Sequence, residues 1–213
     1  MRWCSLRTHA SSGESRLIPY RATAGVPHEL VEHVSWLVCA QRRELDPPWR
    51  RLGCFKQALF VLAHLRKNET FAQLATGFGV SIRTAWRYAD ETSEVLAARA
   101  PGLHEALTGL AGGDPVIADG TRIPTDRITA DRPYYSRKHR KHGMNVQVIA
   151  RPDGTPLWFS RATPPTTPDR GPGERTFAQL KSRRLLRRAR YSTRRTGTII
   201  QAVHTVLTCS YSK

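Results

Sequence analysis

The spacing of hydrophobic positions changes near the middle of the chain. Before residue 100, apolar residues recur every three or four positions, which is typical of helices with one buried face. The predicted helices cover residues 27–45, about 52–65, and two or three segments between 70 and 98. Asp46-Pro47-Pro48 ends the first of them, and two breaks, Pro101-Gly102 and Gly112-Gly113, mark a boundary after the last.

Beyond this boundary the pattern becomes extended. The predicted strands are 115–121, 144–150 and 156–161, and Asp153-Gly154 forms a turn between the last two. A proline-rich segment, 163–173, precedes two further helices at about 174–190 and 197–208, the last with an apolar face. We therefore expect an α+β protein with an irregular, poorly ordered segment 1–26, a helical domain 27–100 and a second domain 114–213.

Charge narrows the class of partner. The chain has 34 Lys and Arg against 17 Asp and Glu, a net charge of +17, which favours an anionic polymer such as nucleic acid. Eight basic residues and no acidic one lie between Lys181 and Arg195, although a solvated charged face would also explain that run. No apolar run is long enough for a membrane span and no secretory leader is recognisable, so we expect a cytoplasmic, nucleoid-associated protein without a membrane partner.

The four cysteines, at positions 4, 39, 54 and 209, form neither a Cys-x-x-Cys pair nor a close cluster with histidine. A zinc site and a disulfide framework are both unfavoured by this spacing. We expect buried or incidental thiols.

Residues 70–88 fit a helix-turn-helix. Ala75 is small enough for a close helix crossing, Gly79 can adopt the positive φ of the turn, and Ser81 can cap the second helix. A plain helical hairpin is the alternative, and Trp86 is expected in the core. The residues expected to contact duplex DNA from the start of the second helix are Ser81, Arg83, Thr84 and Arg87.

Three further blocks follow in order: Pro115–Thr121 (PVIADGT), a segment from Tyr134 to Val148, and Gly173–Lys181 (GERTFAQLK). With the preceding helix-turn-helix, this order resembles the DDE-type transposases of bacterial insertion sequences, in the branch that joins an N-terminal helix-turn-helix to a DDE superfamily endonuclease domain. The resemblance implies a ribonuclease-H-like core. It also implies three acidic residues that hold two divalent ions, Mg²⁺ or Mn²⁺, for cutting and joining DNA strands.

In this resemblance Asp119 matches the first acidic residue and Glu174 the third, so both are expected as catalytic residues and metal ligands. Arg170, Glu174 and Lys181 keep the family's spacing, while Thr167 stands where a tyrosine is expected. An Asp-Gly turn at Asp119 and an ordinary first-turn glutamate at Glu174 are the alternatives. The residues expected along the DNA backbone after Glu174 are Lys181, Arg184 and Arg188, and His142 and Asn145 are expected near the site.

The second acidic residue has no match. Only 54 residues separate Asp119 from Glu174, and Asp169, in the proline-rich segment, is the acid left there as a candidate metal ligand. We therefore expect an internally truncated ribonuclease-H-like core that no longer cuts DNA, in a protein that binds transposon ends. The sequence does not decide whether the protein forms a homo-oligomer. A DNA-binding regulator without catalysis is the main alternative, and an RNA-binding protein fits less well because no base-stacking motif is present.

Overall fold

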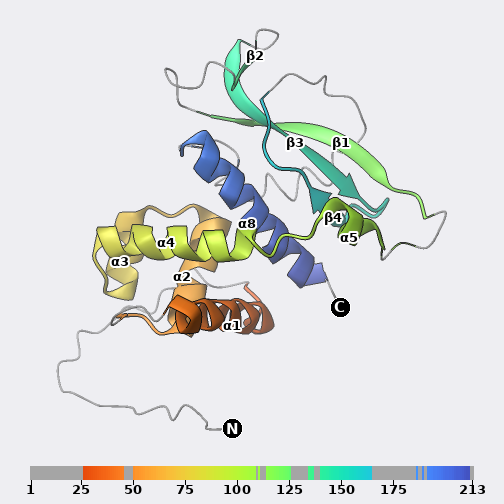
Figure 1. Ribbon diagram of the computed structural model, residues 1–213. Coiled ribbons are helices and arrows are strands. Elements are labelled where there is room, and N and C mark those ends of the chain that lie inside the picture. The colour runs from red at the N-terminus through yellow and green to blue at the C-terminus, as the bar shows by residue number, and fades with distance from the viewer. Residues whose placement is uncertain are drawn as a thin grey trace, which may run out of the picture.

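A computed structural model describes residues 26–45, 50–108, 110, 114–125, 134–136, 140–164, 186, 189 and 191–211. Helices and one antiparallel sheet make up these residues, which confirms the α+β class (Figure 1). The ribonuclease-H-like core and the domain limits stay predictions. The predicted features that lie outside the described residues are the segment 1–25 and the residues Asp169, Glu174, Lys181, Arg184 and Arg188.

The first half of the chain forms the predicted helices. Their bounds are α1 His28–Leu45, α2 Cys54–Lys67, α3 Phe71–Phe78, α4 Ile82–Ala97 and the short α5 Leu103–Thr108. In Figure 1, α1 to α4 gather on one side of the molecule and the sheet lies on the other. Among the described residues, no helix is long and apolar enough to cross a membrane.

The sheet contains β1 Ile117–Pro124, β2 Tyr135–Ser136, β3 Lys141–Ala150 and β4 Pro156–Phe159. The other three strands all pair with β3 in antiparallel fashion. The three predicted strands are confirmed, with shifted ends. The turn between β3 and β4 is also confirmed, because Gly154 has a φ of 90° and its N–H bonds to the carbonyl of Arg151 at 2.9 Å.

Only two residues of the helix predicted over 174–190 are described. Leu186 is helical and buried, whereas Ala189 forms an isolated parallel bridge with Thr125, just past the end of β1. The N–H of Ala189 donates to the carbonyl oxygen of Pro124 at 2.9 Å. The predicted helix therefore does not continue through Ala189.

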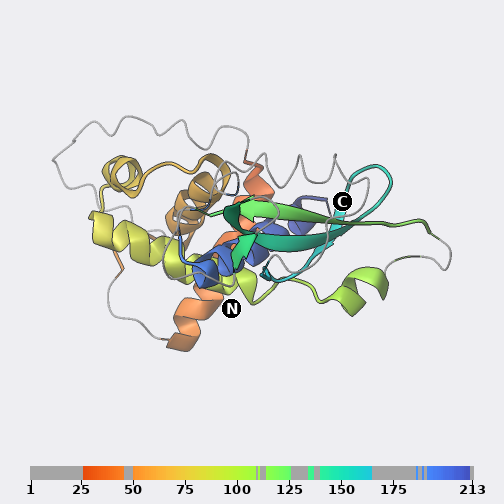
Figure 2. The same ribbon diagram turned by 90° about the horizontal axis from the view of Figure 1, so that it is seen from above.

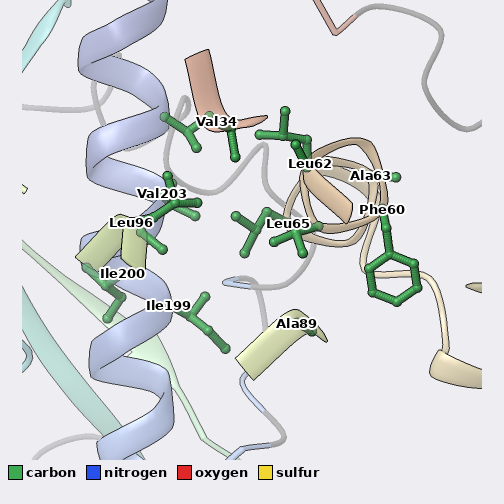
Figure 3. Close-up of a cluster of buried hydrophobic side chains, with 14 of the residues drawn as sticks. Val34, Phe60, Leu62, Ala63, Leu65, Ala89, Leu96, Ile199, Ile200 and Val203 are labelled. Carbon is green, nitrogen blue, oxygen red and sulfur yellow. The ribbon is translucent and has the colours of Figure 1, made fainter. Parts of the chain in front are cut away.

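Helix α8, Thr193–Tyr211, lies between the helical layer and the sheet (Figures 1 and 2). Ile199 and Val203 extend from it toward Leu65 of α2 in Figure 3, and Leu96 of α4 packs beside them. The apolar face predicted for this helix is confirmed, since all five of its members are at most 4% exposed: Ile199, Ile200, Val203, Val206 and Leu207.

Polar side chains of α8 bond to both neighbours. The Thr205 hydroxyl donates to the carbonyl oxygen of Leu96 at 2.8 Å, at the end of α4. On the sheet side, Gln201 Nε2 donates to the carbonyl oxygen of Ser160 at 3.0 Å, and His204 Nε2 bonds to that of Leu157 at 3.2 Å. Directional bonds thus fix the depth and rotation of α8, while the apolar face supplies the burial.

A disulfide joins Cys39 of α1 to Cys54, the first residue of α2, with their Cα atoms 5.7 Å apart. The expectation of incidental thiols is therefore wrong for this pair, because the crossing of α1 over α2 brings together two cysteines whose spacing forms no motif. Arg42 holds the same crossing, since its guanidinium donates to the carbonyl oxygen of Leu52 at 3.0 Å and to the side chain of Gln57.

We predict that opening the Cys39–Cys54 bond lowers the free energy of unfolding by about 3 kcal/mol, because a cross-link that closes a loop of this length restricts the unfolded chain. Denaturant melts of the oxidised protein, the reduced protein and Cys39→Ser measure the difference. Cys209→Ser is the matched control, since Cys209 is a free cysteine. Equal midpoints for the oxidised protein and Cys39→Ser would contradict the prediction.

Candidate nucleic-acid interface

The turn between α3 and α4 has the geometry that the sequence predicts. Gly79 ends α3 in the left-handed region, with a φ of 64°, which glycine adopts without the strain a side chain would bring. The next N–H, of Val80, donates to the carbonyl oxygen of Ala75 at 2.9 Å. Leu74 and Ala75 are buried where the two helices cross, so the helix-turn-helix arrangement of this pair is confirmed.

Ser81 caps α4, as predicted. Its Oγ accepts the backbone N–H of Thr84 at 3.1 Å and donates to the Thr84 hydroxyl at 2.9 Å. Thr70 and Gln73 form a capping box at the start of α3 in the same way. Each helix of the pair therefore begins at a fixed residue, which sets the side chains that the first turn of α4 presents to solvent.

The exposed face of α4 carries two arginines and two large apolar residues. Arg83 and Arg87 are exposed, and so are Ile82, at 58%, and Trp86, at 47%. The expectation that Trp86 lies in the core is wrong. Ile82 and Trp86 continue one edge of the buried side of α4 toward the start of the helix, where they are left exposed. The buried residues of α4 are Ala85, Tyr88, Ala89, Thr92, Ser93 and Leu96.

The start of α8 is attached to this exposed face through Arg195. Its guanidinium carbon lies 4.6 Å from the ring centroid of Trp86 and 5.5 Å from that of Tyr191, close enough for cation–π attraction to both. The same guanidinium forms an ion pair with Asp90, one turn after Trp86 on α4. Arg195, absent from the sequence-based site, thus packs against α4; no motif would have singled it out.

Tyr191 extends this contact inward to His64 of α2. The Tyr191 hydroxyl lies 3.2 Å from His64 Nε2, and His64 Nδ1 lies 3.3 Å from the carbonyl oxygen of Glu69. Because a carbonyl only accepts, Nδ1 carries the proton and Nε2 accepts from the tyrosine. Burial lowers the pKa of His64 to about 4, and the charge of Arg195 acts in the same direction.

Asp119 lies within β1 and not at its end. It pairs with Val148 of β3 and Gly120 pairs with Gln147, so the alternative of an Asp-Gly turn is wrong. Asp119 is half-buried, and its Oδ1 accepts the N–H of Gly120 at 2.7 Å. Strand alternation places its side chain on the face that carries Thr121 and Ile123, which is the face toward the buried core.

The residues expected near Asp119 on β3 are not its neighbours. Asn145 pairs with Arg122 and lies three residues from Val148, so it is on the opposite face of the sheet. His142 pairs with Tyr135, six residues from Val148, roughly 20 Å away at the rise of a strand. Both lie on β3, as predicted, but the register separates them from Asp119.

Within the described residues, no group of three or more His, Cys, Asp or Glu side chains is placed to hold a metal ion. Asp119 is the one predicted metal ligand in this part of the chain, because Asp169 and Glu174 lie outside it. One carboxylate does not supply the several oxygen ligands that Mg²⁺ or Mn²⁺ takes in a nuclease, so the described residues do not by themselves fit the ion.

Comparison with known proteins supports the resemblance. Residues 50–102 match the family described as "Helix-turn-helix of DDE superfamily endonuclease". Both this match and the relative below support the resemblance of the chain to insertion-sequence DDE transposases with an N-terminal helix-turn-helix. The matched residues of the transposase-type helix-turn-helix span α2 to α4, so α1 and its disulfide to α2 begin outside the match.

The chain is 35% identical over 107 residues to a protein of Streptomyces albus G named "Putative transposase for insertion sequence element IS112". The match covers 50% of this chain and 38% of that protein, so the chain spans well under half of the relative's length. No solved structure gives a significant match.

We predict that the protein loses stability in mild acid through His64. Its pKa is about 4 in the folded state, so between pH 6.5 and pH 4 the unfolded chain binds a proton that the folded chain does not. The free energy of unfolding should fall by about 2 kcal/mol from pH 8 to pH 5 through this residue. The loss should be complete below the folded-state pKa and absent above pH 6.5.

Denaturant melts at several pH values test this. His64→Gln should remove this fall of about 2 kcal/mol from the pH dependence of the free energy of unfolding. His33→Gln, at an exposed position of α1, should leave the fall in place. Burial also lowers the pKa of His204, whose contribution remains in both variants. An equally steep profile in His64→Gln would contradict the prediction.

Proposed function

We propose that this transposase-family protein recognises the duplex DNA of transposon ends by placing the start of α4 in a major groove. The observation that carries the proposal is the exposed face of α4. A capped helix follows a helix-turn-helix turn and presents Arg83 and Arg87 one turn apart. Side chains from the first turns of such a helix are the ones that reach base edges and phosphates.

The net charge of the chain and the capped start of α4 support this role. The net charge of +17 attracts a polyanion, and the arginines of α4 lie on its solvent-exposed side. Ser81 and Thr84 bond to each other in the cap, so their proposed part is to fix the helix start beside the DNA backbone. Lys181, Arg184 and Arg188 are proposed to contact the phosphate backbone after Glu174.

For the second half of the chain we propose a shortened DDE core that does not cleave DNA. Asp119 on β1, in a sheet of antiparallel strands, is the proposed first carboxylate, and Glu174 is the proposed third, with Asp169 as the acid left between them. A two-metal reaction needs several carboxylates on rigid elements, and the sequence offers no match for the second one. Mg²⁺ or Mn²⁺ would therefore be held weakly.

A second candidate is a DNA-binding regulator that acts in the cytoplasm, at the nucleoid, without any strand transfer. The shortage of carboxylates near Asp119 in the described residues favours it. Both candidates need the same contact between α4 and duplex DNA, and they differ only in catalysis.

We predict that Arg83→Ala combined with Arg87→Ala weakens specific duplex binding at least tenfold, since a base-reading arginine contributes about 1–3 kcal/mol. The probe is a duplex selected by the full chain from a random library. If one of the two arginines contacts a phosphate and not a base, its replacement should lower the slope of log affinity against log salt by about one. Arg99→Ala is the matched control, because Arg99 is exposed just past the other end of α4.

We predict no cleavage of the selected duplex in Mg²⁺ or Mn²⁺, together with unchanged duplex binding by Asp119→Asn. Product strands are measured on denaturing gels. Cleavage that disappears in Asp119→Asn but persists in Asp153→Asn would show an active core and contradict the truncation. Asp153 is a suitable control, because it bonds locally to Thr155 in the turn between β3 and β4.

A further inference from the structure

We propose that Ile82 and Trp86 recognise the 5-methyl group of thymine in the bound duplex, and that Arg195 of α8 is a positioning residue that holds the Trp86 ring for this contact. The inference rests on the proposed DNA-binding function and adds a base preference to it. It also gives the C-terminal helix a part in sequence recognition.

The first support is the placement of the two apolar side chains. Ile82 is the first residue of α4 and Trp86 follows four positions later, so both lie on one side of the helix. Each is about half exposed or more, and Arg83 and Arg87 lie beside them, about 100° further round the helix. Single exposed apolar residues are common, but a pair flanked by two arginines at the start of a recognition helix is a surface of mixed chemistry.

The second support is the fixed position of Trp86. Arg195 lies over its ring at 4.6 Å, and Arg195 is itself held by the ion pair with Asp90 and by the ring of Tyr191. A tryptophan held in this way loses little rotamer freedom on binding, which makes an exposed contact more favourable. Trp86 remains 47% exposed with Arg195 over its ring, so part of the side chain is accessible to a ligand.

The third support is complementarity with one base. In the major groove, thymine is distinguished by its C5-methyl group, which apolar side chains contact, whereas guanine presents two acceptors that suit arginine. The apolar pair Ile82 and Trp86, with the arginine pair beside it, therefore fits a site that contains both thymine and guanine. The charge of the flanking arginines disfavours a second copy of this chain as the occupant, because like charges would meet.

The test replaces thymine by deoxyuridine, one position at a time, in the duplex selected by the full chain. This change removes only the methyl group. For the wild-type protein, affinity should fall about fourfold at one or more positions, the value of one buried methyl group. Ile82→Ala or Trp86→Ala should bind the thymine and uracil duplexes equally, and Arg99→Ala should discriminate as the wild type does.

Arg195 is tested by the ratio of the affinities for the thymine and uracil duplexes. Arg195→Gln should reduce discrimination between thymine and uracil, and Arg195→Lys, which keeps a cation beside Trp86 and Asp90, should restore part of it. Thermal melts confirm that each variant is folded. A change that lowered affinity for both duplexes equally would show that Arg195 acts only structurally and would overturn its positioning role.

The remaining outcomes separate the two proposals. If the wild type prefers its selected duplex but no uracil substitution weakens it, or if the selected duplex has no thymine, the thymine contact is wrong while DNA recognition stands. If discrimination persists in both Ile82→Ala and Trp86→Ala, other residues read the methyl group and the assignment is overturned. If no duplex is preferred over random DNA, the proposed function fails and the inference fails with it.

Discussion

Packing of α8 between two layers determines how the parts of this molecule are placed. One side of the helix packs mainly against α4, with α1 and Leu65 of α2 alongside. The other side bonds to the carbonyl oxygens of Leu157 in β4 and of Ser160 just after it. Each fully buried aliphatic side chain contributes about 1.5–3 kcal/mol, and α8 buries five such residues. The helix-turn-helix and the sheet are therefore joined through a shared apolar core and not only through the chain that connects them.

This packing also reaches the candidate DNA surface. Arg195, in the first turn of α8, lies over Trp86, and Tyr191, just before α8, lies against His64. The exposed face of α4 and the buried side of α2 are thus linked by one short series of contacts. Within this series, His64 is buried and neutral, while Arg195 forms an ion pair with Asp90. Arg195 is near enough to the imidazole to disfavour its protonation. Helix α4 is thus supported by residues that come more than 100 positions later in the chain.

Much of the helical half could be predicted from the sequence, because local signals specify it. Gly79 and Ser81 have conformations that their residue types favour, and the stripe on α8 is regular enough to give its buried face. The sequence mispredicts Trp86 because it lies on the same stripe of α4 as the buried residues Ala89 and Ser93, and only the packing of the other helices decides where along α4 this stripe stops being covered. The Cys39–Cys54 bond depends on a crossing of two helices, which spacing alone does not reveal.

The candidate catalytic region was less predictable for a different reason. Pattern alone indicated that Asp119 lies on a strand, but the pairing of Asp119 with Val148 decides which face it occupies and how far His142 and Asn145 lie from it. β2, with two residues, is too short to have a pattern at all. Register is a long-range property, and a single residue of slip would move every side chain to the other face.

The position of α8 has a consequence for synthesis on the ribosome. The bond between Thr205 and Leu96 spans 109 residues, so α4 emerges long before the helix that covers its apolar side. Until then Leu65 and Leu96 have no cover from Ile199 and Val203, and Trp86 has no Arg195 beside it. A nascent chain therefore carries α4 without its full cover until the strands of the sheet have been translated.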